Sequence, residues 1–325
     1  MSTLKNIIKP LKNDLKLFQK EFDSSLNSNV RLINIVSKYL IRNRGKKIRP
    51  ILTLLAARLC GKPSLNSYRA SAMVELLHLA TLVHDDVVDD ASIRRGFTSI
   101  NKVWKNKISI LMGDFILSKA LINMISIKDF DALECISNTA EKLSAGELLQ
   151  LEKSITKTMS ERVYFDMIKQ KTASLIACSC ELGAITTKKK KSDRKAMYSY
   201  GENLGVAFQI KDDLLDLLGS ESEIGKNKGG DIKRNMVTLP LIYSKRKMSG
   251  RQNRVLKNLL NQFKKNKNVL NKIVNLIKEA GGIKYTKDQL DYFSSKALEV
   301  IEPYPKSEFK DSMINLVLFN KNRSS

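Results

Sequence analysis

The chain has 325 residues, enough for one large domain or two smaller ones, and its hydrophobic share of 42% is typical of a globular protein. No run of about 18 apolar residues occurs, so we expect no membrane-spanning helix. The N-terminus alternates lysines with apolar residues and lacks a cleavage site, so we expect no signal peptide. The net charge of +24 is compatible with a nucleic-acid partner. Because the basic residues are scattered and aromatic residues do not interleave with them, we expect no nucleic acid as the main partner, only a general attraction for polyanions.

The cysteines indicate a reducing environment. All four lie in apolar, helix-like segments, and their spacing is not that of a zinc site. Cys178 and Cys180 are two residues apart, so a helix would point them in different directions. We therefore expect buried free thiols and a cytoplasmic protein.

Helical periodicity dominates the chain. Apolar residues recur at three- and four-residue spacing in six long segments, and no alternating segment with hairpin turns predicts a strand. The sequence therefore predicts one all-α domain over residues 1–325, a bundle of ten or more helices around a deep central cavity. The six expected helices are Ile51–Cys60, Tyr68–Asp90, Ile108–Ser126, Phe130–Leu151, Arg162–Leu182 and Arg194–Leu218.

Two segments between these helices are expected to be loops. Thr186–Asp193 contains four consecutive lysines and should be exposed. Gly219–Met236 is the longest break, rich in glycine and lysine and poor in apolar residues. Because it directly follows an acidic cluster, it predicts a mobile flap over a site.

The most informative feature is a run of four aspartates near the end of the second expected helix. Asp85 and Asp89 are four residues apart and share one helix face, with Asp86 and Asp90 beside them. Four carboxylates so close together repel one another and destabilise a helix unless a cation neutralises them. This spacing predicts a cation site rather than a merely solvated acidic face.

The same Asp-Asp-x-x-Asp spacing returns about 125 residues later, at Asp212, Asp213 and Asp216. Aliphatic residues fill the two intervening positions both times, so each helix keeps an apolar side for packing. Carboxylates without a matching set of histidines or cysteines favour a hard cation, and Mg²⁺ is typically bound by one or two carboxylates together with substrate phosphates. Walker-type and dinucleotide-binding glycine loops are absent from the sequence, which excludes a nucleotide-binding fold of those kinds.

Basic residues stand where a phosphorylated ligand would need them. Lys46 and Arg49 lie between Gly45 and Pro50, just before an expected helix, and Arg94-Arg95 follow the first acidic run. Each pair alone is typical of a surface cluster, but next to the acidic runs each favours a binding site.

Two uncharged candidates accompany the acidic runs. His78 is seven residues before Asp85, two turns away on the same helix face. Its position alone is compatible with a structural role in the core and with a role in binding. Gln209 is three and four residues before Asp212 and Asp213, so it shares the second acidic face. Lys171-Thr172 form no motif that would identify them as site residues without a family for comparison.

These motifs, in their order and spacing, resemble those of the trans-polyprenyl diphosphate synthases, most closely the bacterial octaprenyl diphosphate synthases. The resemblance runs from about Leu26 to the C-terminus. Its markers are Gly45-Lys46-Lys47-Ile48-Arg49-Pro50, Leu82 to Asp89, Arg94-Arg95-Gly96, Gly113-Asp114, Gly146-Glu147, Lys171-Thr172-Ala173, Phe208-Gln209 with Asp212 to Asp216, and Thr238-Leu239-Pro240.

The resemblance implies a single polyprenyl synthase domain of the isoprenoid synthase type that joins isopentenyl diphosphate to an allylic prenyl diphosphate with Mg²⁺. It further implies farnesyl diphosphate as the primer, an octaprenyl product for a quinone side chain, a homodimer, and at most transient membrane contact during product release. The implied roles follow. Isopentenyl diphosphate is held by Lys46, Arg49, His78 and Arg95, the allylic diphosphate by Arg94, Lys171, Thr172 and Gln209, and Mg²⁺ by Asp85, Asp89, Asp212 and Asp216.

Two positions depart from the family pattern. Arg44 stands where the family usually has a second glycine. Arg234-Asn235-Met236 replaces a Glu-Gly-Lys, and the missing lysine ordinarily helps to bind the diphosphate. Compensation by a neighbouring basic residue and weaker substrate binding are the two alternatives.

Product length depends on the apolar side of the first acidic helix. Ala80 lies five residues before Asp85, about 7.5 Å along the axis at 1.5 Å per residue. In short-chain synthases of this family, bulky side chains block the tail at the corresponding site. The small Ala80 therefore favours a long product, although an alanine chosen for helix packing is an equal alternative.

Four rival functions are considered. A shorter-chain farnesyl or geranylgeranyl synthase would share every motif. A non-catalytic subunit of a heteromeric synthase typically lacks the acidic motifs, which are both intact here. A terpene cyclase would share an acidic helix but not the Gly45–Pro50 and Arg94-Arg95 arrangement. A basic nucleic-acid binder would show salt-dependent DNA binding instead of condensation.

Overall fold

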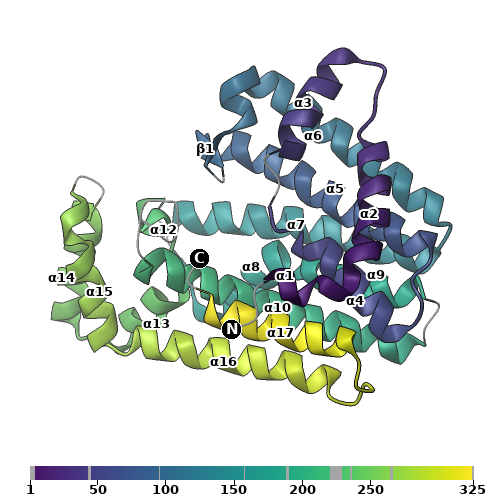
Figure 1. Ribbon diagram of the computed structural model, residues 1–325. Coiled ribbons are helices and arrows are strands. Elements are labelled where there is room, and N and C mark those ends of the chain that lie inside the picture. The colour runs from purple at the N-terminus through teal and green to yellow at the C-terminus, as the bar shows by residue number, and fades with distance from the viewer. Residues whose placement is uncertain are drawn as a thin grey trace. The chain divides into compact units, whose positions relative to one another are not determined.

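Helices make up almost all of the computed structural model, which describes residues 4–42, 45–94, 96–156, 158–187, 190–219, 229–234, 236–263 and 266–323, without the side chain of residue 267 (Figure 1). The helices are α1 (Leu4–Ile7), α2 (Lys12–Ser25), α3 (Arg31–Arg42), α4 (Ile48–Cys60), α5 (Leu65–Val88), α6 (Ile100–Ile127), α7 (Phe130–Thr156), α8 (Glu161–Ile168), α9 (Ser174–Ile185), α10 (Lys191–Leu218), α12 (Gly230–Lys233), α13 (Leu239–Lys247), α14 (Gly250–Phe263), α15 (Leu270–Glu279), α16 (Gly282–Ile301) and α17 (Glu308–Asn322). Short 3₁₀ turns occupy Lys9–Leu11 and Lys267–Val269. The prediction of an all-α fold is confirmed.

The described residues form two compact units, each assembled from separate stretches of chain. Unit 1 comprises Met1–Glu141, Leu175–Gly201 and Val300–Leu316, and unit 2 comprises Lys142–Ser174, Glu202–Glu299 and Val317–Ser325. Unit 1 carries the first acidic run and unit 2 the second. The single domain over residues 1–325 stays a prediction.

In unit 1, α5 is the central helix. It packs along α6 and against α2 and α4. Met73, Leu76, Leu77 and Ala80 are buried at the spacing of one helical stripe, so this face of α5 is anchored in the core. The helix begins three residues earlier than predicted, because Ser64 and Ser67 form a capping box in which each side chain pairs with the other's backbone.

In unit 2, the core gathers residues of α8, α10, α13, α14, α15 and α16, including Tyr164, Ile210, Leu239, Leu256 and Ile273. The helix predicted over Arg162–Leu182 is continuous in sequence but irregular in structure. A π-helical segment, Lys169–Ala173, joins α8 to α9. Such segments add a residue to a helical turn and shift the direction of the side chains that follow.

No sequence pattern predicted the small two-stranded sheet that the described residues contain. Strands β1 (Ile93–Arg94) and β2 (Phe97–Thr98) pair antiparallel after α5. The turn between them needs Gly96, whose φ of +82° is costly for other residues. This hairpin positions Arg94.

One described helix, α6, is long and apolar enough to cross a membrane by length and composition. Core helices of soluble proteins meet the same criterion, and one side of α6 packs along α5. The expectation that no segment spans a membrane therefore stays a prediction.

The expected loop Thr186–Asp193 is shorter than predicted, because α10 already begins at Lys191. Residues 188 and 189 lie outside the described part. Most of the expected flap, residues 220–228 and 235, also lies outside it.

Gly183 on α9 provides a test of helix packing in unit 1. A Cβ built there would lie 2.7 Å from Ala56 Cβ and closer still to the Thr53 carbonyl oxygen of α4. We expect Gly183→Ala to lower the free energy of unfolding by about 1–3 kcal/mol, because overpacking outweighs the better helix propensity of alanine. Urea unfolding followed by circular dichroism measures this.

The matched control is Gly250→Ala at the start of α14, where an added Cβ meets nothing within 4 Å. Its urea midpoint should stay the same or rise slightly. Equal midpoints for the Gly183 variant and the wild type would contradict the close helix contact.

Candidate active site

The first carboxylate set lies at the C-terminal end of α5. The helix ends at Val88, and Asp89 is the C-cap residue, with its N–H donating to the Asp85 carbonyl oxygen at 2.8 Å. This bond keeps Asp85 and Asp89 on one helical turn, as predicted. Asp85 is half-buried and Asp89 exposed, while Asp90 turns away with φ of +46° and pairs with Lys102 at 2.8 Å.

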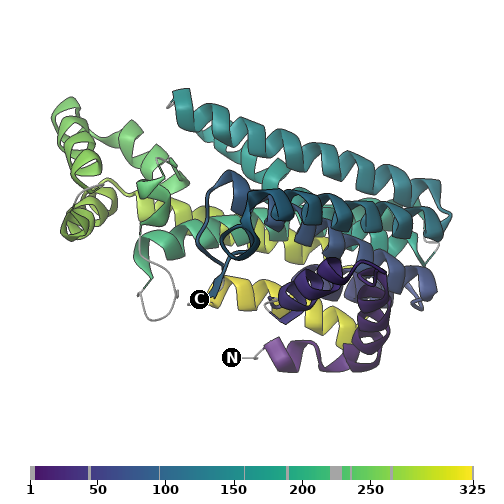
Figure 2. The same ribbon diagram turned by 90° about the horizontal axis from the view of Figure 1, so that it is seen from above.

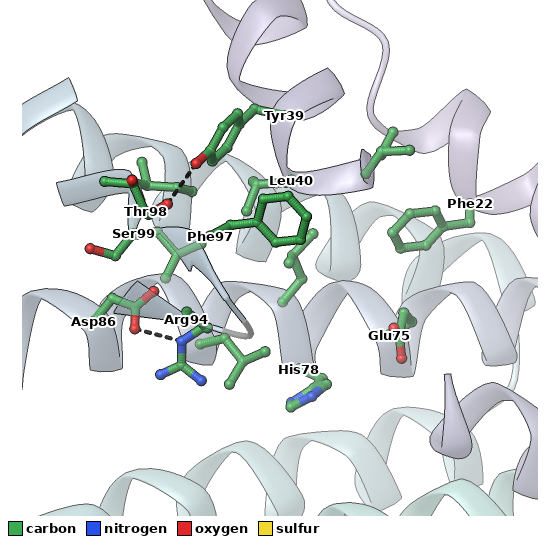
Figure 3. A pocket seen from close by; sticks show the side chains of 15 residues that line it. Phe22, Tyr39, Leu40, Glu75, His78, Asp86, Arg94, Phe97, Thr98 and Ser99 are labelled. Atoms are coloured by element: carbon green, nitrogen blue, oxygen red, sulfur yellow. Dashed lines mark hydrogen bonds and ion pairs between the residues drawn. The ribbon is translucent and has the colours of Figure 1, made fainter. Parts of the chain in front are cut away.

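Asp86, between them, has a different environment. It is only 4% exposed, and its carboxylate accepts a hydrogen bond from Arg94 Nε at 2.5 Å (Figure 3). Asn101 Nδ2 also donates to the Asp86 backbone carbonyl at 3.1 Å. Burial of a carboxylate is costly unless hydrogen bonds or a cation compensate for the lost hydration, and here Arg94 does so. Arg94 is therefore held against α5 by the acidic run itself.

A pocket opens beside this pair in unit 1. His78, Asp86 and Arg94 line it together with apolar residues of α2, α3 and α5 (Figure 3). Tyr39 Oη donates to the Thr98 carbonyl oxygen at 2.6 Å, which ties β2 to α3 along its edge. The structure thus brings His78 and Arg94 to one pocket.

Lys46 and Arg49 are not among the residues that line this pocket. Lys46 is exposed just before α4, and Arg49 is half-buried in the first turn of α4. Lys47, between them, adopts a left-handed conformation and bonds to Gln19 of α2. Arg95 lies outside the described residues.

The Gly113-Asp114 marker contacts His84, next to the first acidic run. The ring of His84 on α5 lies directly over Gly113 on α6, where any Cβ would collide with it. His84 Nε2 is 3.4 Å from a carboxylate oxygen of Asp114. This pair of residues thus lets α5 and α6 approach closely beside Asp85.

The second carboxylate set repeats the pattern in unit 2. Asp213 is only 3% exposed and accepts hydrogen bonds from Tyr164 Oη at 2.6 Å and from Gln209 Nε2 at 2.9 Å. Burial raises the pKa of the Asp213 carboxyl well above its ordinary value, and these two hydrogen bonds oppose the rise. Thr172 Oγ1 donates to Gln209 Oε1 at 2.8 Å, so two predicted diphosphate residues form one chain of bonds to Asp213.

Asp216 connects α10 to the far end of the expected flap. Its two carboxylate oxygens accept the N–H groups of Gly230 and Asp231, each at 3.1 Å, at the start of α12. Burial and the nearby Asp231 charge raise the pKa of Asp216 to about 6. Each oxygen keeps further lone-pair capacity for a cation.

Asp212 has a partner that sequence reasoning missed. Arg323 Nη2, near the C-terminus, lies 2.5 Å from Asp212 Oδ1 and donates to the Phe208 carbonyl oxygen at 3.1 Å. Its guanidinium lies 4.2 Å from the centre of the Phe208 ring. A signal existed: Arg323 is the only arginine after Arg254, in a stretch with twelve lysines. Planar, bidentate and stacking contacts favour arginine over lysine.

The π-helical segment positions Lys171 and Thr172. Lys171 Nζ lies 2.6 Å from Glu147 and 3.0 Å from Gln150, both on α7, while Thr172 faces Gln209 on α10. Two glycines allow this close packing. A Cβ on Gly146 would lie 2.7 Å from Lys171 N, and one on Gly205 would lie 2.5 Å from Ala173 Cα. The Gly146-Glu147 marker is thus explained by packing and by an ion pair.

The two acidic runs share one design. The second aspartate is buried and bonded to the protein, whereas the first and fifth stay accessible or half-accessible. Within the described residues, no three His, Cys, Asp or Glu side chains gather into a metal-binding group. The sets nevertheless fit Mg²⁺ chemically, because they offer carboxylate oxygens alone and Mg²⁺ takes its remaining ligands from water and substrate phosphates. Metal binding by Asp85, Asp89, Asp212 and Asp216 stays a prediction.

An all-α protein with two such carboxylate sets and basic residues around each belongs to the class of proteins suited to diphosphate chemistry. A family model described as Polyprenyl synthetase matches residues 30–277. The chain therefore belongs to the polyprenyl synthetase family and is a polyprenyl diphosphate synthase, a transferase of isoprenoid biosynthesis.

Relatives and solved structures agree with this assignment. The octaprenyl diphosphate synthase of Haemophilus influenzae is 32% identical over 96% of this chain and 94% of that protein. Heptaprenyl diphosphate synthase component 2 of Bacillus subtilis is 33% identical over 93% of this chain and 86% of that protein. A polyprenyl synthase from Caulobacter crescentus, solved with calcium and isoprenyl diphosphate, superposes with a TM-score of 0.92 at 30% identity over 99% of this chain and 98% of that one.

The Arg323–Asp212 pair gives a prediction for unit 2. The Arg323 side chain is 10% exposed and Asp212 is 41% exposed, so the pair is partly screened by water. We expect Arg323→Ala to lower the free energy of unfolding by about 1–2 kcal/mol, since it removes a charged hydrogen bond and a ring contact. Urea unfolding measures the loss.

Arg323→Lys serves as the control, because it keeps the charge but not the planar fork, and it should recover less than half of the loss. An Arg323→Ala variant as stable as the wild type would show that the pair does not hold the C-terminal residues in place.

Proposed function

We propose that this protein condenses isopentenyl diphosphate with an allylic prenyl diphosphate, farnesyl diphosphate, in a Mg²⁺-dependent reaction. The product is a long all-trans polyprenyl diphosphate, and we propose octaprenyl diphosphate for a quinone side chain. One observation carries the proposal: each acidic run buries its second aspartate in a bonded position, while its first and fifth aspartates are half-buried or exposed.

The two carboxylate sets have a common task in this proposal. Asp85 and Asp89 in one set, and Asp212 and Asp216 in the other, would hold Mg²⁺, which would supply charge stabilisation for the departing diphosphate. The carbon–oxygen bond of the allylic diphosphate breaks and leaves an allylic cation. The double bond of isopentenyl diphosphate attacks this cation, and a proton passes to the released diphosphate. The prenyl chain of the substrate is then one isoprene unit longer.

The protein's own residues bind the two diphosphates. Lys46, Arg49, His78 and Arg95 hold isopentenyl diphosphate in this proposal. Arg94, Lys171, Thr172 and Gln209 hold the allylic diphosphate. Support comes from pre-positioning: Arg94 is held by Asp86, Lys171 by Glu147, and Thr172 by Gln209. Groups already ordered lose little further entropy on binding.

Exclusion of water is the task we propose for residues 219–236, because water would trap the cation as an alcohol. The end of this segment is anchored to Asp216 through Gly230 and Asp231. Met236, where the family has a lysine, is half-buried, and its N–H donates to the Asp231 carbonyl oxygen at 2.8 Å. The neighbouring Arg234 pairs with Asp231 at 3.1 Å, which places one basic residue beside this anchor.

A homodimer in the cytoplasm is part of the proposal. Exposed apolar residues on α6, among them Leu111, Ile122 and Ile125, favour a covered surface. Free cysteines favour a reducing compartment. Because one relative is named component 2, a heteromeric synthase is the alternative. Condensation by the purified chain alone would separate the two.

The central experiment measures condensation of radiolabelled isopentenyl diphosphate with farnesyl diphosphate and Mg²⁺. We expect Asp85→Ala and Asp212→Ala each to cut turnover by about 10²–10³-fold, because each removes charge stabilisation of the leaving group. Removal of metal with EDTA should abolish the reaction.

Asp90→Ala is the matched control, since Asp90 lies in the same run but turns away to Lys102. It should keep near-normal turnover. Near-normal rates for the Asp85 and Asp212 variants, or for the EDTA-treated enzyme, would contradict the metal role.

Product length tests Ala80. It is 1% exposed on the buried stripe of α5 and does not line the pocket beside Arg94. We expect Ala80→Tyr to shorten the product to geranylgeranyl length, one addition to farnesyl diphosphate, because the ring would block an apolar path for the tail. Reversed-phase chromatography of the products measures it.

A graded series of Ala80→Val, Ala80→Leu and Ala80→Tyr controls for misfolding, since product length should fall step by step with side-chain volume. Full-length product from a folded Ala80→Tyr variant would show that Ala80 does not line the path.

A further inference from the structure

The segment of residues 245–278 is the most one-sidedly charged part of the chain. It contains eleven lysines and arginines and no acidic residue. It covers the end of α13 and the helical hairpin formed by α14 and α15, which pack against each other within unit 2 (Figures 1 and 2). A surface with this charge attracts anions over a distance of about one Debye length.

Helix α14 presents a defined outer face. Leu256 and Phe263 are buried against the core of unit 2, while Arg251, Arg254 and Val255 are exposed at helical spacing on the other side. Val255, 44% exposed, adds an apolar side chain to this face. Such a face is basic and amphipathic, without any carboxylate of its own.

The described arginines elsewhere mostly find carboxylates within the protein. Arg58, Arg94 and Arg194, for example, pair with Asp14, Asp86 and Asp131. No carboxylate in the described parts of the chain pairs with Arg251 or Arg254, nor with Lys257. The charge of this face is therefore available to a partner outside the protein.

We propose that the hairpin of α14 and α15 docks the protein on an anionic lipid surface. Basic residues near such a surface each contribute to binding, and their contributions add up along a helix. A nucleic acid is a poorer match, because the only aromatic residue of this segment, Phe263, is buried and offers no stacking platform for bases. The reason for docking on a membrane rests on the proposed function, since a long apolar product must pass from the enzyme into a bilayer.

The test uses the full-length protein and sedimentation with vesicles. We expect binding to phosphatidylcholine vesicles that contain phosphatidylglycerol, no binding to pure phosphatidylcholine, and release at high salt. The triple variant R251Q/R254Q/K257Q should lose roughly hundredfold in vesicle affinity, given the contribution expected for each basic residue near an anionic surface. The double variant K272Q/K278Q on α15 should lose less.

The matched control is K12Q/K16Q/K20Q, which removes the same charge from three exposed lysines on one face of α2. It should bind vesicles almost as well as the wild type. Equal losses for both triple variants would overturn the proposal in favour of net charge alone. Undiminished binding by the hairpin variant would overturn it as well.

Two further measurements separate the alternatives. A fluorescent DNA duplex that is bound through the hairpin, without vesicle binding, would overturn the proposal in favour of a nucleic-acid surface. Condensation of soluble short substrates should be unchanged in R251Q/R254Q/K257Q. Vesicle binding by a wild-type protein that does not catalyse condensation would refute the proposed function but not the docking surface. Condensation by a wild-type protein that does not bind vesicles would refute the docking surface but not the proposed function.

Discussion

The buried second aspartate of each acidic run is the constraint on which the site depends. Burial of a carboxylate is costly unless a partner compensates for lost hydration. Asp86 takes Arg94 as that partner, and Asp213 takes Tyr164 and Gln209. Because these partners must reach a fixed oxygen, their own positions become fixed. The buried aspartate thus orders the residues proposed to bind substrate, while the first and fifth aspartates of the run are half-buried or exposed.

This constraint extends into the backbone. Gln209 is joined to Thr172, and the π-helical segment between α8 and α9 carries both Thr172, which faces α10, and Lys171, which faces α7. The segment in turn needs Gly146 and Gly205 beside it, where a side chain would strike its backbone. Markers that look unrelated along the sequence are therefore parts of one packed arrangement in unit 2.

Much of this could be predicted from the sequence, because helical periodicity and carboxylate spacing are local properties. Geometry between residues i and i+4 was enough to predict helix α5, the shared face of the aspartates in each acidic run and the nearness of Gln209 to Asp213. The π-helical break and the hairpin of Arg94 did not, since both depend on contacts made across the fold. Arg323 was missed because it lies 111 residues from Asp212, although its isolation among lysines was visible in the sequence.

The two units satisfy the same constraint with different charges. In unit 1 the buried aspartate is bonded to a cation, Arg94, which is also a proposed diphosphate ligand. In unit 2 the buried Asp213 accepts hydrogen bonds from the neutral Tyr164 and Gln209 and has a raised pKa, and the cation Arg323 pairs with Asp212 instead. Arriving metal and diphosphate would therefore compete with an existing ion pair at Arg94 in one unit and at Asp212 in the other. The first contact orients a proposed substrate-binding group, whereas the second shields a proposed metal ligand, so the two runs share a spacing without being equivalent sites.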